Sequence, residues 1–180
     1  MASDSVIGEQ VKRISGGVAG ILAAADAEIA GRGAVCRGSG RCCHFEEWGH
    51  RLYVTTAELV HFVHAHLAIA ARQSKIGNQE TGITSLAQFL AEKDPGGCPF
   101  QSGTLCTVRD SRPLGCRVYF CDRAAQAWQN DVYEKYHAQL RALHEQFKVP
   151  YRYLEWRAAL RQWADAPSEG IIEALLARQT

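Results

Sequence analysis

Apolar residues recur at steps of three and four positions along most of the chain, which predicts a mainly helical protein. The first apolar stripe predicts a helix over 4–32, and Gly16 and Gly17 near its middle favour a bend or a break there. Further stripes predict helices from after Thr55 to about Gln73, over 86–93, over 122–148, over 151–164 and over 168–178. The fold class expected from this pattern is mainly α, a small helical bundle.

Two stretches interrupt the helical pattern, and together they contain all seven cysteines. The first is CRGSGRCC at 36–43, in which Gly38 and Gly40 permit a sharply turning loop. The second is CPFQSGTLCTVRDSRPLGCRVYFC at 98–121, in which Gly103 predicts a tight β-hairpin. We expect two irregular cysteine-rich loop segments that converge at one end of the bundle.

A start signal for a helix follows a short predicted strand. Residues 51–55, RLYVT, are typical of a strand because β-branched and aromatic side chains favour extended backbone. Thr55 and Glu58 have the spacing of a capping box, in which each side chain accepts a backbone N–H of the other residue. We therefore expect a helix that begins directly after Thr55.

Length and charge limit the classes of function. The chain of 180 residues fits a single domain over 1–180, with a cysteine-cluster core at 36–121 and flanking helices at 4–32 and 122–178. A formal net charge of +1 supplies no broad basic field, so we expect neither nucleic acid nor membrane as a partner. The chain begins without a basic segment followed by a long apolar run, which indicates a cytoplasmic protein.

Clustered cysteines in a reducing compartment more often bind metal than form disulfides. Thiolates suit zinc and iron, so the expected cofactor is a zinc ion or an iron–sulfur cluster. The ligand pool consists of Cys36, Cys42, Cys43, Cys98, Cys106, Cys116 and Cys121. Plain buried thiols and a redox sensor are the alternatives, although adjacent cysteines are poorly placed for a disulfide with each other.

Arginines accompany the second cysteine segment. Arg112 and Arg117 are expected beside the metal, where positive charge would offset a thiolate centre. The same side chains could hold an anionic substrate, or form a solvated basic face. An enzyme with an open position on an iron centre is therefore the alternative function, and the sequence leaves open whether the protein is an enzyme.

Other candidate residues have plainer interpretations. His61 and His64 share one helical face, but spacing places no third ligand beside them, so we interpret them as partly exposed helix residues. The aromatic residues Tyr151, Tyr153 and Trp156 fall in the helix expected over 151–164 and are interpreted as its core face.

The order of motifs resembles the CxxCxxCC family of zinc- or iron-chelating domains, the YkgJ-like cysteine-cluster proteins. The matching parts are Cys36, Cys42, Cys43, the helix start at 55–58, CPF at 98–100, LC at 105–106 and RPLGCR at 112–117. The resemblance implies a bound metal, either zinc or iron. Some members of the family are associated with methylation of flagellin lysines, but no G-x-G-x-x-G follows a strand here, so that activity is not carried over.

One position departs from the family pattern. Ser39 stands where the family has its second cysteine, and a serine hydroxyl is a poor ligand beside thiolates. His44 directly follows Cys43 and is a candidate replacement, because neutral imidazole binds both zinc and iron. The site therefore either uses fewer sulfurs or takes a ligand from another group.

Overall fold

A computed structural model describes residues 2–73, 96–119, 121 and 123–162. The helices in this part are α1 (Ala2–Gly31), α2 (Thr56–Gln73), α4 (Leu114–Val118), α5 (Gln126–Phe147) and α6 (Trp156–Gln162), with short 3-10 turns at Arg41–Cys43, Arg109–Ser111 and Arg123–Ala125. The strands are β1 (Tyr53–Thr55), β2 (Gln101–Ser102), β3 (Leu105–Cys106) and β4 (Tyr153–Glu155). The fold is mainly α, as the sequence predicts.

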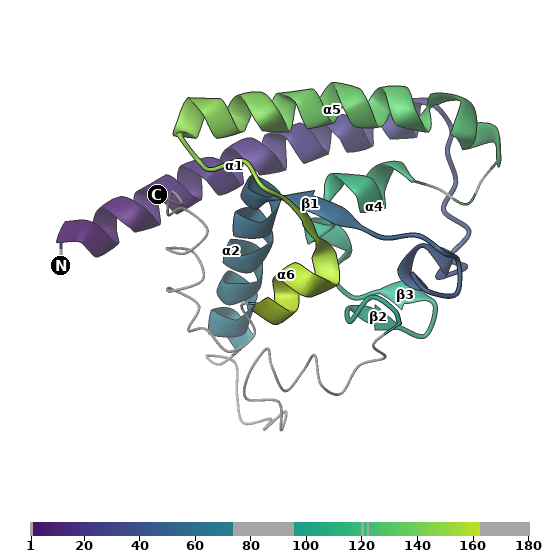
Figure 1. Ribbon diagram of the computed structural model, residues 1–180, viewed down its shortest axis with the longest axis horizontal. Coiled ribbons are helices and arrows are strands. Elements are labelled where there is room, and N and C mark those ends of the chain that lie inside the picture. The colour runs from purple at the N-terminus through teal and green to yellow at the C-terminus, as the bar shows by residue number, and fades with distance from the viewer. Residues whose placement is uncertain (1, 74–95, 120, 122, 163–180) are drawn as a thin grey trace.

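The two long helices lie side by side and form one layer, with α2 beneath them (Figure 1). The buried stripe of α1 consists of Val11, Ile14, Val18, Leu22, Ala25 and Ile29. The break favoured at Gly16 and Gly17 does not occur, because α1 runs without interruption through both residues. A Cβ on Gly17 would lie 2.6 Å from Leu143 Cδ1 of α5, so this glycine serves close helix packing instead of a break.

The length and apolar character of α1 also fit a membrane span. Residues Ile7–Gly31 form a stretch long and apolar enough to cross a bilayer, and a core helix of a soluble protein meets the same criteria. In this structure the apolar stripe of α1 packs against α2 and α5.

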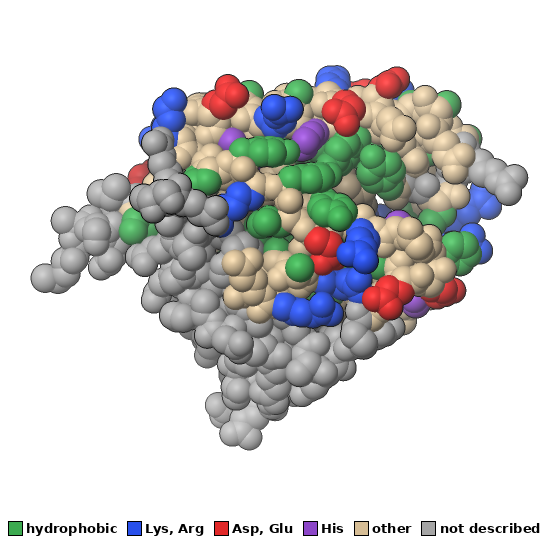
Figure 2. Space-filling model, in the orientation of Figure 1, with side chains coloured by type: hydrophobic (Ala, Val, Ile, Leu, Met, Phe, Trp, Pro, Cys, Tyr) green, Lys and Arg blue, Asp and Glu red, His purple; other side chains and the backbone are tan. Residues whose placement is uncertain are grey.

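The prediction of a helix over 151–164 is wrong for its first residues. Residues 153–155 form β4, which pairs antiparallel with β1 so that Val54 lies opposite Leu154. The helix α6 begins only at Trp156, which is buried, whereas Tyr151 and Tyr153 are exposed instead of forming a core face. Figure 2 shows hydrophobic side chains gathered on the surface below α5, around this strand pair.

The remaining expectations have mixed outcomes. The strand expected over 51–55 is present at 53–55, and the helix expected after Thr55 is present over Thr56–Gln73. The β2–β3 hairpin, with Gly103 at a φ of 58°, is confirmed. The long helix α5 begins at Gln126, after a 3-10 turn, and not at residue 122. The helices expected over 86–93 and 168–178 lie outside the described residues.

Glu58 joins the start of α2 to the start of α4. Its Oε2 accepts hydrogen bonds from the backbone N–H of Thr55 (2.8 Å) and from the Thr55 hydroxyl (2.9 Å), which confirms the capping box. Its Oε1 accepts the backbone N–H of Leu114 at 2.8 Å. Burial raises the pKa of Glu58, and these hydrogen bonds oppose that increase. The carboxylate thus fixes the cysteine-bearing helix α4 against the end of β1.

We expect Glu58→Gln to lower the free energy of unfolding by about 1–3 kcal/mol, because one accepting oxygen becomes an NH₂ group that faces a buried N–H donor. Urea denaturation measures the change. Glu134→Gln on the exposed surface of α5 is the matched control, expected to stay within about 0.5 kcal/mol of the wild type. Equal stability of the two variants would show that the Glu58 contacts do not hold the fold.

Candidate metal centre

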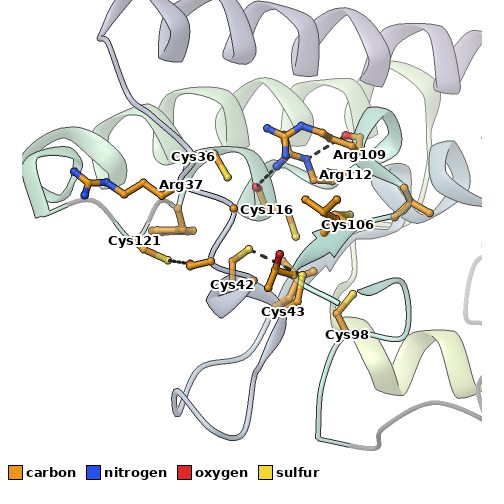
Figure 3. A pocket seen from close by; sticks show the side chains of 18 of the residues that line it. Cys36, Arg37, Cys42, Cys43, Cys98, Cys106, Arg109, Arg112, Cys116 and Cys121 are labelled. Carbon is orange, nitrogen blue, oxygen red and sulfur yellow. Dashed lines mark hydrogen bonds between the residues drawn. The ribbon is translucent and has the colours of Figure 1, made fainter. Parts of the chain in front are cut away.

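All seven cysteines line one cavity of about 80 Å³ (Figure 3). Cys36 comes from the loop after α1, Cys42 and Cys43 from the 3-10 turn, and Cys98 from the turn before β2. The other three belong to β3, to α4 and to the segment after α4; they are Cys106, Cys116 and Cys121. In Figure 3, Cys36 and Cys121 lie on one side of the cavity and Cys98 and Cys106 on the other. Segments separated by more than 50 residues of sequence therefore contribute thiols to one place.

Backbone contacts hold the two cysteine segments together. The Cys98 N–H donates to the Cys43 carbonyl at 2.7 Å, and the Glu46 N–H donates to the Gly96 carbonyl at 3.1 Å. Gly40 has a φ of 73°, in the left-handed region that favours glycine. Its position leaves no room for a side chain, because a Cβ would lie 2.7 Å from Gln101 Nε2 and 3.1 Å from the Thr104 Cα.

Two of the thiols belong to the 3-10 turn and lie close together. Cys42 Sγ lies 4.0 Å from Cys43 Sγ. Four thiolates around one zinc ion lie about 3.8 Å apart, as follows from tetrahedral zinc–sulfur bonds of about 2.3 Å. Among the described residues, no three His, Cys, Asp or Glu side chains are already close enough to hold one ion. A bound ion would therefore draw further sulfurs inward from the cavity wall.

Hydrogen bonds and burial lower the pKa of some of these thiols and raise the pKa of others. The Cys43 thiol interacts with both Cys42 and Cys98, which raises the pKa of Cys43 and lowers those of the other two. The pKa of Cys42 falls to about 6, and the nearby charge of Arg112 contributes. Burial has the opposite effect on Cys106 and Cys116, since it raises the pKa of both thiols.

The two arginines expected beside the metal occupy different places. Arg112 lines the cysteine cavity, where its Nη1 donates to the Cys116 carbonyl at 3.3 Å and its Nε donates to the Arg109 carbonyl at 3.1 Å. Arg117 does not line it. Its guanidinium is buried, is paired with Asp26 of α1 and donates to the carbonyls of Asp110 and Arg112. Arg117 thus holds the loop that positions Arg112.

The sequence singles out Ser39 as a departure from the resembled motif and His44 as a candidate ligand in its place. Ser39 lines the cavity, and its Oγ lies 3.7 Å from Cys121 Sγ. His44 does not line the cavity. Its Nε2 is 2.9 Å from the Gln101 amide nitrogen, and its Nδ1 is 3.4 Å from a Glu47 carboxylate oxygen. His44 therefore faces the hairpin and the surface in this structure.

Sequence reasoning missed Trp156 as a neighbour of the thiols. This residue is 1% exposed and lines the cavity, although it belongs to α6. Its indole N–H contributes to the lowered pKa of Cys98 but does not meet hydrogen-bond geometry with any described residue. A buried donor without a regular acceptor is what a charged sulfur centre would use. The register of β4 with β1 brings Trp156 here, and no local motif predicts that register.

The histidines on α2 are separate from the cysteines. Ser15 Oγ of α1 lies 2.9 Å from His61 Nδ1 and 3.2 Å from His64 Nδ1. These contacts connect α1 to α2, and neither histidine lines the cysteine cavity.

We expect Gly40→Ala to lower the free energy of unfolding more than Gly49→Ala does. Both glycines have a positive φ, of 73° and 64°, but a Cβ on Gly49 meets no atom within 4 Å. The difference between the variants isolates the clash with the hairpin, which we expect to cost about 1–3 kcal/mol beyond the shared backbone strain. Urea denaturation of both variants measures it. If the two variants are equally stable, the close contact between the cysteine segments does not restrict the residue at position 40.

Comparisons of the chain with protein-family models, with curated proteins and with solved structures find no match.

Proposed function

We propose that this chain is a cytoplasmic metal-binding protein that chelates zinc or iron through thiolates of the two cysteine segments, with an iron–sulfur cluster as one form of the iron. The observation that carries the proposal is that all seven cysteines line one cavity. The motif order that resembles the CxxCxxCC family, with RPLGCR at 112–117, supports the same function.

The donor set fits such a centre. Cys42, Cys43 and Cys98 interact through their sulfurs, and Cys106 and Cys116 lie on the remaining wall. Four cysteines complete a tetrahedral zinc site, and four also complete an iron–sulfur cluster, which spaces its thiolates more widely. Zinc would supply structural cross-linking of the two segments, and a cluster would supply electron transfer.

The surroundings of the thiols compensate negative charge. Arg112 lines the cavity, and its charge lowers the pKa of Cys42. The indole N–H of Trp156 is a further donor beside the thiols and contributes to the lowered pKa of Cys98. Positive charge and N–H donors around thiolates stabilise an anionic metal–sulfur centre, and for a cluster they also shift its reduction potential.

We expect protein purified without oxygen to contain metal, and Cys42→Ala or Cys98→Ala to weaken metal binding by more than about tenfold. Elemental analysis, acid-labile sulfide and the visible spectrum distinguish zinc from a cluster. Leu105→Ala is the matched control, because Leu105 is 64% exposed and lines the same cavity without a sulfur. Metal-free wild-type protein that is fully folded would contradict the proposal.

We expect Ser39→Cys to slow the loss of metal to a chelator, because the new thiol would stand beside Cys121 on the cavity wall. Ser102→Cys is the control, since Ser102 lies on the exposed strand β2 and does not line the cavity. Chelator competition on both variants measures the rate of loss. Equal rates in the two variants would show that position 39 does not reach the metal.

A further inference from the structure

A second hollow, of about 630 Å³, opens beside the cysteine cavity. Cys42, Cys116 and Cys121 line both spaces. Its volume lies in the range of small-molecule sites. We call it the aromatic groove, and its defining side chains are Arg41, Trp48, Arg51, Tyr53, Tyr119 and Tyr153.

Aromatic rings form one wall of the groove. Tyr53 of β1 and Tyr153 of β4 stack with ring centroids 5.2 Å apart and planes 17° apart. The Tyr153 hydroxyl lies 2.7 Å from the Tyr133 hydroxyl, and the Tyr133 ring lies 5.5 Å from that of Tyr119. Hydrogen bonding and stacking thus fix the orientation of this wall.

The rings nevertheless remain exposed. The exposed fractions of Tyr53, Tyr119 and Tyr153 are 39%, 44% and 45%, and that of Trp48 is 47%. Figure 2 shows the hydrophobic side chains that gather on the face below α5. Contiguous exposed aromatic surface in a concave site is typical of a place where a flat ligand stacks.

The groove also carries positive charge. The Arg41 guanidinium lies 4.3 Å from the centre of the Trp48 ring, and Arg51 is exposed nearby. In the part of the chain that the structure describes, no acidic side chain lines the groove, and neither arginine has an ion-pair partner. The neighbouring acids Glu46 and Glu47 instead contact Arg157 and His44.

We propose that the aromatic groove binds an aromatic anion, a flat ring system that carries a carboxylate or a phosphate. The ring stacks on the tyrosine wall, and the anion is bound by Arg41 and Arg51, whose planar guanidinium groups match both oxyanions. The shared residues Cys42, Cys116 and Cys121 place such a ligand against the thiol cavity. Any role of this ligand beside a metal rests on the proposed function. The binding of the ligand to the groove does not depend on a metal.

The test uses calorimetric titration of the full chain with 2-naphthoate, with 2-naphthylmethylammonium and with adenosine monophosphate. We expect at least one of the two anions to bind with a dissociation constant below about 1 mM, and the cation to bind about tenfold more weakly. Tighter binding of the carboxylate assigns an aryl carboxylate, and tighter binding of the nucleotide assigns a nucleoside phosphate. Equal binding of cation and anions, or no binding of either anion, overturns the inference.

Variants connect the binding to the groove. Arg41→Ala should weaken the binding of the anion about tenfold, because it removes one charge-assisted contact. Arg141→Ala is the matched control, since Arg141 also lies over an aromatic ring, that of Tyr151 at 5.6 Å, but outside the groove. An equal loss in both variants would overturn the assignment to the groove.

A metal assay of the same preparation separates the two proposals. If protein without metal binds the anion and the binding depends on Arg41, the proposed ligand site in the groove is supported and the proposed metal centre is contradicted. If the protein contains metal but binds neither anion, the proposed metal centre is supported and the proposed ligand site in the groove is contradicted.

Discussion

The buried carboxylate of Glu58 is the constraint on which the arrangement of the site depends. It accepts N–H groups from Thr55 and Leu114, 59 positions apart in sequence, and thereby joins the ends of β1 and α4. A buried carboxylate is costly unless such donors surround it, so its environment has to be formed as a whole. The segment of Leu114 also carries Cys116, and the strand of Thr55 pairs with β4, which leads to Trp156. One interaction therefore fixes two walls of the cysteine cavity.

Local sequence determines the parts of the site that depend on short-range chemistry. The capping box at Thr55 and Glu58, the turn at Gly103 and the left-handed Gly38 and Gly40 all have the expected conformation, because each depends on neighbouring residues. What the sequence could not provide is the pairing partner. Residues 153–155 form a strand because β1 offers them hydrogen bonds, and this tertiary contact overrides the helical spacing of the apolar residues around them.

The same distinction separates Arg112 from Arg117. Both are in the RPLGCR motif and both have the charge that a thiolate centre needs, so the sequence alone treats them alike. They lie in different elements: Arg112 follows the 3-10 turn at 109–111 and lines the cavity, whereas Arg117 belongs to α4 and is buried against Asp26 of α1. Asp26 belongs to the helix that the family resemblance does not cover. The flanking helix α1 thus contributes to the site through the loop that Arg117 holds, and it is more than a scaffold for the core.

Burial and thiol chemistry together indicate how the proposed centre would take up a cation. Cys116 is half-buried, and burial raises the pKa of its thiol well above the ordinary value. A thiol of this kind ionises only when a positive charge arrives with the loss of its proton, which is what coordination to a metal provides. Cys42 differs, because its contact with the Cys43 thiol and the charge of Arg112 lower its pKa, which favours the thiolate. In the proposed centre, Cys42 would be the first ligand for an incoming ion, and Cys116 would lose its proton only as the ion is enclosed.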